Sequence, residues 1–184
     1  MMRVISGSAR GRKLRTLEGL DTRPTADRVK EGLFSALHFR LPAARVLDLF
    51  AGSGQLGIEA LSRGADHCLF VDSSRQCTDV ITENLKACGF FKKSRVVCMD
   101  VFSFLVAKGD KFDIIVLDPP YRMEDPTALA AAAAGRLADG GALAFESSVD
   151  NPPAQEVDGL RLYRRYRYGK TFVTVYEKDR GEEA

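Results

Sequence analysis

The stretch Val46-Leu-Asp-Leu-Phe-Ala-Gly-Ser-Gly-Gln-Leu-Gly57 joins an apolar run to a helical pattern through a glycine-rich turn. Its first five residues predict a buried strand, and the residues from Gln55 to Arg63 predict a helix. Its three glycines form G-x-G-x-x-G, in which glycine permits a tight turn and close approach of a ligand to the backbone. Asp72 follows Gly52 by 20 residues, at the end of the next apolar run. This spacing is typical of a nucleotide-binding βαβ unit whose carboxylate holds ribose hydroxyls.

Strand and helix patterns alternate along the rest of the chain. We expect further strands at residues 68–71, 95–99, 112–117 and 142–145, and helices at 74–88, 101–107 and 126–137. Two β-prone runs, 160–168 and 171–176, are joined near Gly169 and predict a hairpin. The order predicts a Rossmann-like α/β fold: a doubly wound, mostly parallel seven-stranded sheet with an antiparallel C-terminal hairpin.

The N-terminal residues predict a separate small unit. Short β-prone pieces alternate with glycines in residues 1–20, which indicates a hairpin-like arm. Residues 24–39 then predict a helix with Thr25 as its N-cap and an apolar stripe at helical spacing. We therefore divide the chain into a basic N-terminal β-hairpin arm, residues 1–22, and an α/β domain, residues 23–184.

Length and composition predict one cytoplasmic domain. The chain has 184 residues, 45% of them hydrophobic and 28% charged, which is ordinary for a globular domain. No run approaches the roughly 18 apolar residues of a membrane span, and the N-terminus lacks a signal-peptide pattern. The four cysteines are spaced by 9, 11 and 10 residues, and with two histidines they match no zinc pattern. We expect reduced, mostly buried cysteines, no metal and no membrane partner.

Positive charge is concentrated near the two ends of the chain. Residues 1–30 carry eight basic and three acidic residues, and residues 161–180 carry seven and two, so each segment has a net charge of +5. The net charge of the whole chain is only +2, which leaves an acidic middle. This asymmetry indicates a polyanionic partner or, alternatively, two solvated charged segments.

The stretch Asp118-Pro-Pro-Tyr121 follows the apolar run Ile114-Ile-Val-Leu117. Two prolines cannot continue a strand, because each lacks an N–H and fixes φ. The strand therefore ends in a carboxylate, a rigid turn and an aromatic ring, at the sheet edge where open α/β folds bind ligands. The stretch resembles the catalytic motif of S-adenosylmethionine-dependent methyltransferases that modify exocyclic amino groups of bases. An ordinary strand-ending turn is the alternative.

The glycine-rich turn alone fits NAD as well as S-adenosylmethionine. Asp48 favours the latter, because a carboxylate before the turn would repel a pyrophosphate but could hold the cationic amino-acid end of S-adenosylmethionine, directly or through water. Asp100 could accept a hydrogen bond from the adenine amino group near the Val101 backbone, or it could be a helix N-cap. The candidate cofactor-binding residues are Asp48, Gly52, Ser53, Gly54, Asp72, Ser73, Asp100 and Val101.

Motifs along nearly the whole chain resemble those of one family. They are Arg3-Val-Ile-Ser-Gly7, Arg10-Gly-Arg-Lys-Leu14, Arg23-Pro-Thr-Ala-Asp-Arg-Val-Lys-Glu31, the stretch from Leu47 to Leu61, Asp118-Pro-Pro-Tyr121 and Tyr168-Gly-Lys-Thr171. In this order they resemble the RsmD family, bacterial class I methyltransferases that act on the exocyclic N2 of one guanine in 16S ribosomal RNA. The resemblance implies S-adenosyl-L-methionine as cofactor, S-adenosyl-L-homocysteine as product, and 16S rRNA in an assembling small ribosomal subunit as partner.

The resemblance also implies roles for individual residues. The Asp118 carboxylate and the Pro119 carbonyl would accept hydrogen bonds from the guanine amine, the turn through Pro120 would keep them rigid, and Tyr121 would stack on the extruded base. These four are the candidate catalytic residues. The candidate RNA-binding residues, for which plain surface charge is the alternative, are Arg10, Arg12, Lys13, Arg15, Arg23 and Arg28.

Three other functions stay open at this level. An amino-methyltransferase acting on DNA adenine or cytosine shares the Asp118-Pro-Pro-Tyr121 chemistry, although the short chain leaves no evident target-recognition domain. An NAD-dependent oxidoreductase shares the glycine-rich turn, but Asp118-Pro-Pro-Tyr121 would have no role in it. A non-catalytic RNA-binding module with a nucleotide-binding fold uses the basic arm and leaves the spacing of Asp72 unexplained.

Overall fold

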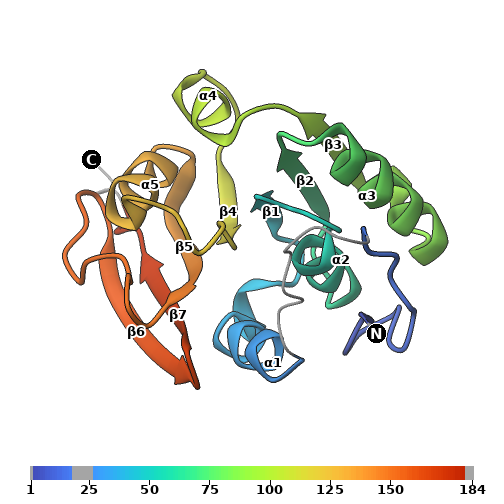
Figure 1. Cartoon of the computed structure of the whole chain (residues 1–184), viewed down its shortest axis with the longest axis horizontal. Helices are drawn as coiled ribbons and strands as arrows, with labels where there is room; N and C mark the ends of the chain where they lie inside the picture. Colours follow the sequence, from blue (N-terminus) through green and yellow to red (C-terminus); the bar gives the residue numbers. More distant parts are fainter. Residues whose placement is uncertain (1, 18–26, 181–184) are drawn as a thin grey trace.

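The computed structural model describes residues 2–17 and 27–180 of the chain. Within these residues seven strands form one sheet in the order β3-β2-β1-β4-β5-β7-β6 (Figure 1). The strands are β1 (Arg45–Leu49), β2 (His67–Asp72), β3 (Ser94–Cys98), β4 (Phe112–Leu117), β5 (Leu137–Ser148), β6 (Arg161–Tyr168) and β7 (Thr171–Glu177). Neighbours from β3 to β5 are parallel, whereas β7 is antiparallel to both β5 and β6. The predicted doubly wound sheet with an antiparallel C-terminal hairpin is confirmed.

Helices cover both faces of this sheet. They are α1 (Asp27–Ala36), α2 (Gln55–Ser62), α3 (Arg75–Cys88), α4 (Val101–Val106) and α5 (Pro126–Ala134), with short 3-10 turns at His38–Arg40 and Phe91–Lys93. The first three helices lie on one face and α4 and α5 on the other, so the sheet separates two apolar cores (Figure 1). The strands β1 and β4 are buried on both faces, as expected of central parallel strands. No helix in the described part of the chain is long and apolar enough to cross a bilayer.

Two predicted elements differ from the structure. The helix expected at 126–137 ends at Ala134, because Arg136 turns away to donate hydrogen bonds to the carbonyls of Phe104, Ala107 and Asp110. The strand expected at 142–145 instead runs from Leu137 to Ser148. The glycines before residue 142 do not break the strand, because Gly140 adopts a positive φ of 73° where the β4–β5 pairing shifts its register.

The cysteines are free thiols, and fewer of them are buried than the sequence suggested. Cys68 and Cys77 are buried, Cys88 is half-buried and Cys98 is exposed. The described part of the helix predicted at 24–39 is α1, from Asp27 to Ala36. The 3-10 turn at His38–Arg40 follows it. The proposed N-cap Thr25 and the proposed boundary after residue 22 lie outside the described residues.

The N-terminal arm, described from Met2 to Leu17, folds back on itself and packs against α2. Its two sides meet at an antiparallel bridge between Arg3 and Lys13, which is the hairpin-like geometry that was predicted. The carboxylate of Glu59 on α2, fully buried, accepts hydrogen bonds of 2.8 and 3.0 Å from the backbone N–H groups of Ile5 and Ser6. These contacts fix the arm to the helix that follows the glycine-rich turn.

Candidate active site

A cavity of about 370 Å³ opens at the carboxyl ends of β1, β2 and β4. This position is the point where the strand order reverses, at which doubly wound folds bind their ligands. The cavity brings together two predicted sets of residues. From the cofactor set it is lined by Asp48, Gly52, Ser53, Asp72 and Ser73, and from the catalytic set by Asp118, Pro119, Pro120 and Tyr121.

The glycine-rich turn between β1 and α2 has the backbone that its sequence requires. Gly52 and Gly54 adopt positive φ values of 56° and 78°, which only glycine adopts without strain. Phe50, which also lines the cavity, has a φ of 58°, a strained conformation that is typical of functional sites. A Cβ at Gly57 would lie 2.2 Å from the ring of Phe70, so the third glycine allows α2 to approach β2 closely.

Asp72 at the end of β2 holds the turn in place. One carboxylate oxygen accepts a hydrogen bond of 2.9 Å from the Gly52 N–H, and the other accepts one of 2.9 Å from the Ser74 N–H. The N-cap of α3 is Ser74, whose hydroxyl accepts a hydrogen bond from Cys77. Asp72 lies two residues before this cap, and it also lines the cavity.

Asp48 is a buried carboxylate in the floor of the cavity. Asp48 is only 1% exposed, and one of its carboxylate oxygens accepts a hydrogen bond of 2.8 Å from the Gly57 N–H. Burial raises the pKa of Asp48 well above its usual value, and the nearby Asp118 and Asp72 raise it further. A cation brought next to this group would favour its charged form.

The motif Asp118-Pro-Pro-Tyr121 directly follows β4. Asp118 is half-buried and Pro119 is buried, whereas Pro120 and Tyr121 are exposed. The turn is closed by a hydrogen bond of 2.9 Å from the Met123 N–H to the Pro120 carbonyl. The phenol of Tyr121 lies 3.2 Å from the hydroxyl of Thr171, and the residue is 46% exposed, so this ring is at the cavity mouth and not in the core.

Three predicted cofactor residues do not line this cavity. Gly54 is buried as the N-cap of α2 and lies behind the turn. Asp100 caps α4 by accepting a hydrogen bond of 2.8 Å from the Ser103 N–H, and this bond is the main reason that the pKa of Asp100 is lowered. Val101 packs in the core between the sheet and α4.

Sequence reasoning missed three residues that shape the site. Met2 lines the cavity, and its sulfur accepts a hydrogen bond of 3.0 Å from the Ser53 hydroxyl. Glu146 lines it from the end of β5; the pairing of Leu117 with Phe145 places it beside Asp118. Glu146 directly follows the apolar run predicted as a strand at 142–145, and this position is a signal that could have found it. Nothing local in the sequence marks Met2.

The third missed residue, Asn84 on α3, connects the arm to the glycine-rich turn. Its amide oxygen accepts a hydrogen bond of 2.8 Å from the Arg15 N–H. Its amide nitrogen donates to the carbonyls of Arg15 and Ser53, at 3.0 and 2.9 Å. Asn84 is 2% exposed, so one buried side chain joins the arm backbone to the cofactor side of the cavity.

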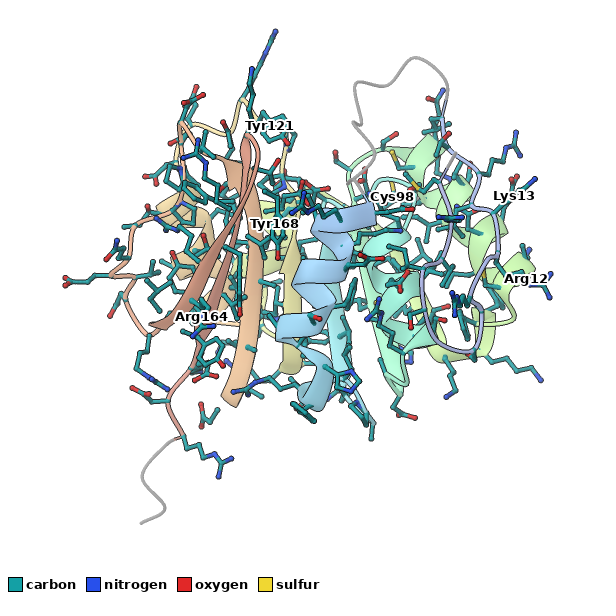
Figure 2. The ribbon with its side chains drawn as sticks, turned by 90° about the horizontal axis from the view of Figure 1, so that it is seen from below. Arg12, Lys13, Cys98, Tyr121, Arg164 and Tyr168 are labelled. Atoms are coloured by element: carbon teal, nitrogen blue, oxygen red, sulfur yellow. The ribbon has the colours of Figure 1, made fainter. Side chains whose placement is uncertain are left out.

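The predicted RNA-binding cations lie on the surface. Arg10, Arg12, Lys13, Arg15 and Arg28 are exposed, and Arg23 lies outside the described residues. Arg15 forms an ion pair with Glu83 on α3. Figure 2 shows Arg12 and Lys13 on the arm, at the opposite side of α1 from Arg164 on β6.

The fold and this cavity define the class of protein. A seven-stranded sheet with an antiparallel final hairpin, a glycine-rich turn after β1 and an acidic residue at the end of β2 make it a class I S-adenosylmethionine-dependent methyltransferase. Residues 2–177 match the family model "Conserved hypothetical protein 95". The chain belongs to this family, the RsmD family.

Individual relatives agree over nearly the full length of the chain. The Bacillus subtilis protein YlbH is 40% identical over 182 residues, which cover 96% of this chain and 99% of YlbH. Ribosomal RNA small subunit methyltransferase D of Escherichia coli is 35% identical, over 97% of this chain and 90% of that protein. The solved structure of Escherichia coli yhhF superposes with a TM-score of 0.86 at 35% identity, over 97% of this chain and 98% of yhhF.

Proposed function

We propose that this protein transfers a methyl group from S-adenosylmethionine to the exocyclic N2 of one guanine in 16S rRNA of the small ribosomal subunit. The observation that carries the proposal is that one cavity joins the glycine-rich turn and Asp72 to Asp118-Pro-Pro-Tyr121. A cofactor site alone would fit many reactions. A rigid carboxylate next to an exposed ring suits transfer to an amino group of a base.

The residues present fit S-adenosylmethionine. Its ribose would lie at Asp72, which lines the cavity, and the turn at Gly52 would allow the cofactor to approach the backbone closely. The cationic amino-acid end would lie near Asp48, whose burial without a cation disfavours its charge. When bound, the cofactor supplies a methyl group that its sulfonium already makes electrophilic.

The catalytic work left to the protein is to prepare the acceptor nitrogen. The lone pair of a guanine N2 amine is delocalised into the ring, so the amine is a poor nucleophile. Acceptors aimed at its two N–H bonds favour a pyramidal nitrogen and localise the lone pair. Asp118 and the Pro119 carbonyl would be these acceptors, and the proline turn holds them in place before the reaction. Asp118 would then take the proton that the amine loses.

Tyr121 and the arm would hold the RNA. The exposed ring of Tyr121 at the cavity mouth can stack on a base that has left its helix. The exposed cations Arg10, Arg12 and Lys13 can contact phosphates. The Escherichia coli relative is named for the RNA of the small ribosomal subunit, which supports that RNA as the substrate. An assembling subunit in the cytoplasm is the partner that we propose. The arm, residues 1–22, would be the RNA-positioning unit of the 23–184 catalytic domain.

A nucleotide-binding assay separates the main alternatives. S-adenosylhomocysteine should raise the melting temperature of this protein, whereas NAD should not. Stabilisation by NAD would favour an oxidoreductase, and stabilisation by neither would favour a non-catalytic RNA-binding module. Transfer of labelled methyl to small ribosomal subunits, followed by nucleoside analysis, then tests the acceptor. Label in N6-methyladenine or N4-methylcytosine of DNA would favour the DNA-modifying alternative.

A further inference from the structure

We propose that the turn end of the β6–β7 hairpin is a second RNA-contacting surface, which holds the backbone next to the target guanine. This surface, the hairpin surface, consists of Arg167 and Lys170. The inference rests on the proposed function, because it takes rRNA as the substrate. It adds a contact that neither the arm nor the cavity supplies.

The sheet topology places this turn at the edge that carries the cavity. The strand β5 is parallel to β4, so both end at the same edge, where Asp118 and Glu146 line the cavity. Ser148 at the end of β5 pairs with Thr171 at the start of β7. The backbone N–H of Val149 donates a hydrogen bond of 3.0 Å to the Lys170 carbonyl. The turn is therefore held beside the end of β5.

A side-chain contact connects the turn directly to the catalytic motif. The phenol oxygen of Tyr121 lies 3.2 Å from the hydroxyl oxygen of Thr171, the residue after Lys170. A base stacked on Tyr121 would therefore lie within a nucleotide's reach of the hairpin turn. In Figure 2, Tyr121 and Tyr168 lie toward the same end of the hairpin, and Arg164 lies farther along it.

The charges along the hairpin are not evenly neutralised. At its open end, Arg161 forms ion pairs of 2.7 Å with Glu177 and 3.6 Å with Asp179. At the turn end, Arg167 and Lys170 are exposed and have no acidic partner among the described residues. Positive charge without a counter-charge therefore remains at the end of the hairpin that reaches the cavity.

The geometry of these cations suits a nucleic acid backbone. The Arg167 side chain is oriented by a hydrogen bond of 3.2 Å from its Nε to the Gly169 carbonyl, which leaves the other guanidinium N–H groups available for phosphate. Arg164 pairs with Val175 in the middle of the hairpin and lies outside this surface. Met2 of the arm and Tyr121 both line the cavity, so RNA held at the arm and at the hairpin surface would pass over the cavity.

The test compares a double variant, Arg167→Gln with Lys170→Gln, with the matched single variant Arg161→Gln. The probe is the small ribosomal subunit purified from cells that lack this protein. Two lost phosphate contacts should lower the slope of log K against log salt by about 1.5, and binding at about 150 mM salt should weaken several-fold. Arg161→Gln should leave the slope unchanged, because its charge is already paired.

Affinity for S-adenosylhomocysteine reports whether the variants are folded, and it should equal that of wild type. Equal salt slopes for an active wild type and the double variant would overturn the inference and leave the proposed function standing. A slope lowered as much by Arg161→Gln would also overturn it, since the effect would then be general surface charge. A wild type that neither binds nor methylates the subunit would overturn the proposed function itself.

Discussion

The carboxylate of Asp72 accepts a hydrogen bond of 2.9 Å from the backbone N–H of Gly52. The two residues lie 20 positions apart in sequence: Gly52 is in the turn after β1, and Asp72 ends the adjacent strand β2. The bond ties the glycine-rich turn to β2, so the carboxylate both shapes the turn and faces the cavity. This double role makes Asp72 the residue on which cofactor binding should depend most.

We expect Asp72→Ala to weaken S-adenosylmethionine binding at least tenfold, which corresponds to about 1.4 kcal/mol. The variant loses the ribose acceptor and the bond that orients Gly52. Calorimetric titration measures the affinity, and Asp79→Ala, an exposed carboxylate on α3 that pairs with Arg75, is the matched control. An affinity equal to that of wild type would remove Asp72 from the cofactor site.

Asp118→Ala should abolish methyl transfer and leave the cofactor affinity within a few-fold of wild type. The group is assigned to the acceptor amine, so its loss should appear in the chemical step, where such groups contribute about 10²–10⁴-fold. Single-turnover rates with saturating cofactor check this. A variant that retains more than roughly a tenth of the wild-type rate would contradict the catalytic assignment.

The buried carboxylate of Asp48 should make stability depend on pH. Its native pKa is raised by burial, so the native state keeps a proton that the unfolded chain releases near its ordinary value of about 3.9. The free energy of unfolding therefore falls as pH rises from the unfolded to the native pKa. Asp48→Asn, which keeps an acceptor for the Gly57 N–H, should escape this loss.

Denaturant titrations of both proteins from pH 4 upward measure that difference. The stability advantage of Asp48→Asn should grow with pH and level off above the native pKa, while its affinity for S-adenosylmethionine should be lower than that of wild type. Two stability curves that stay parallel across the range would show that Asp48 carries no such penalty.

Neutralising Arg10, Arg12, Lys13 and Arg15 together should weaken RNA binding and leave cofactor binding unchanged. Four lost phosphate contacts would lower the slope of log K against log salt by roughly 3. Arg15 also pairs with Glu83, so its share should be the smallest. Salt titrations with small ribosomal subunits check the prediction, and equal slopes would mean that the arm is only solvated surface.

Asn84→Ala should affect stability and cofactor binding together. It leaves part-buried backbone groups of Arg15 and Ser53 without their partner, which costs about 1 kcal/mol or more. Because Ser53 belongs to the glycine-rich turn, affinity for S-adenosylhomocysteine should also fall. Lys86→Ala, an exposed position on the same helix, is the control. A loss of stability with unchanged cofactor affinity would show that the arm and the turn are not coupled.

The fold could be predicted well because its signals are local. The apolar strands, the G-x-G-x-x-G turn and the prolines after β4 each specify their own backbone conformation, and the structure places them as expected. Glycines were less informative inside β5, since Gly140 takes a positive φ within a strand that continues past it. Pairing with β4 and β7 outweighed that local signal.

The sequence predicted only those residues of the site that belong to a recognisable motif. Met2 and Asn84 act through contacts with residues distant in sequence, such as Ser53, and no spacing rule marks them. Asp100 shows a second difficulty, because a carboxylate between a strand and a helix can either contact a ligand or cap the helix. The sequence pattern is the same in both cases. In the structure Asp100 caps α4 by accepting a hydrogen bond from the Ser103 N–H.

The most direct test of the central claim is to map methylated nucleosides in 16S rRNA from three matched strains. One lacks this protein, one carries the wild type, and one carries Asp118→Ala. We predict N2-methylguanine at a single position with the wild type, and an unmodified guanine at that position in the other two strains. Identical methylation maps in all three strains, or a methyl group that appears on another base, would contradict the account.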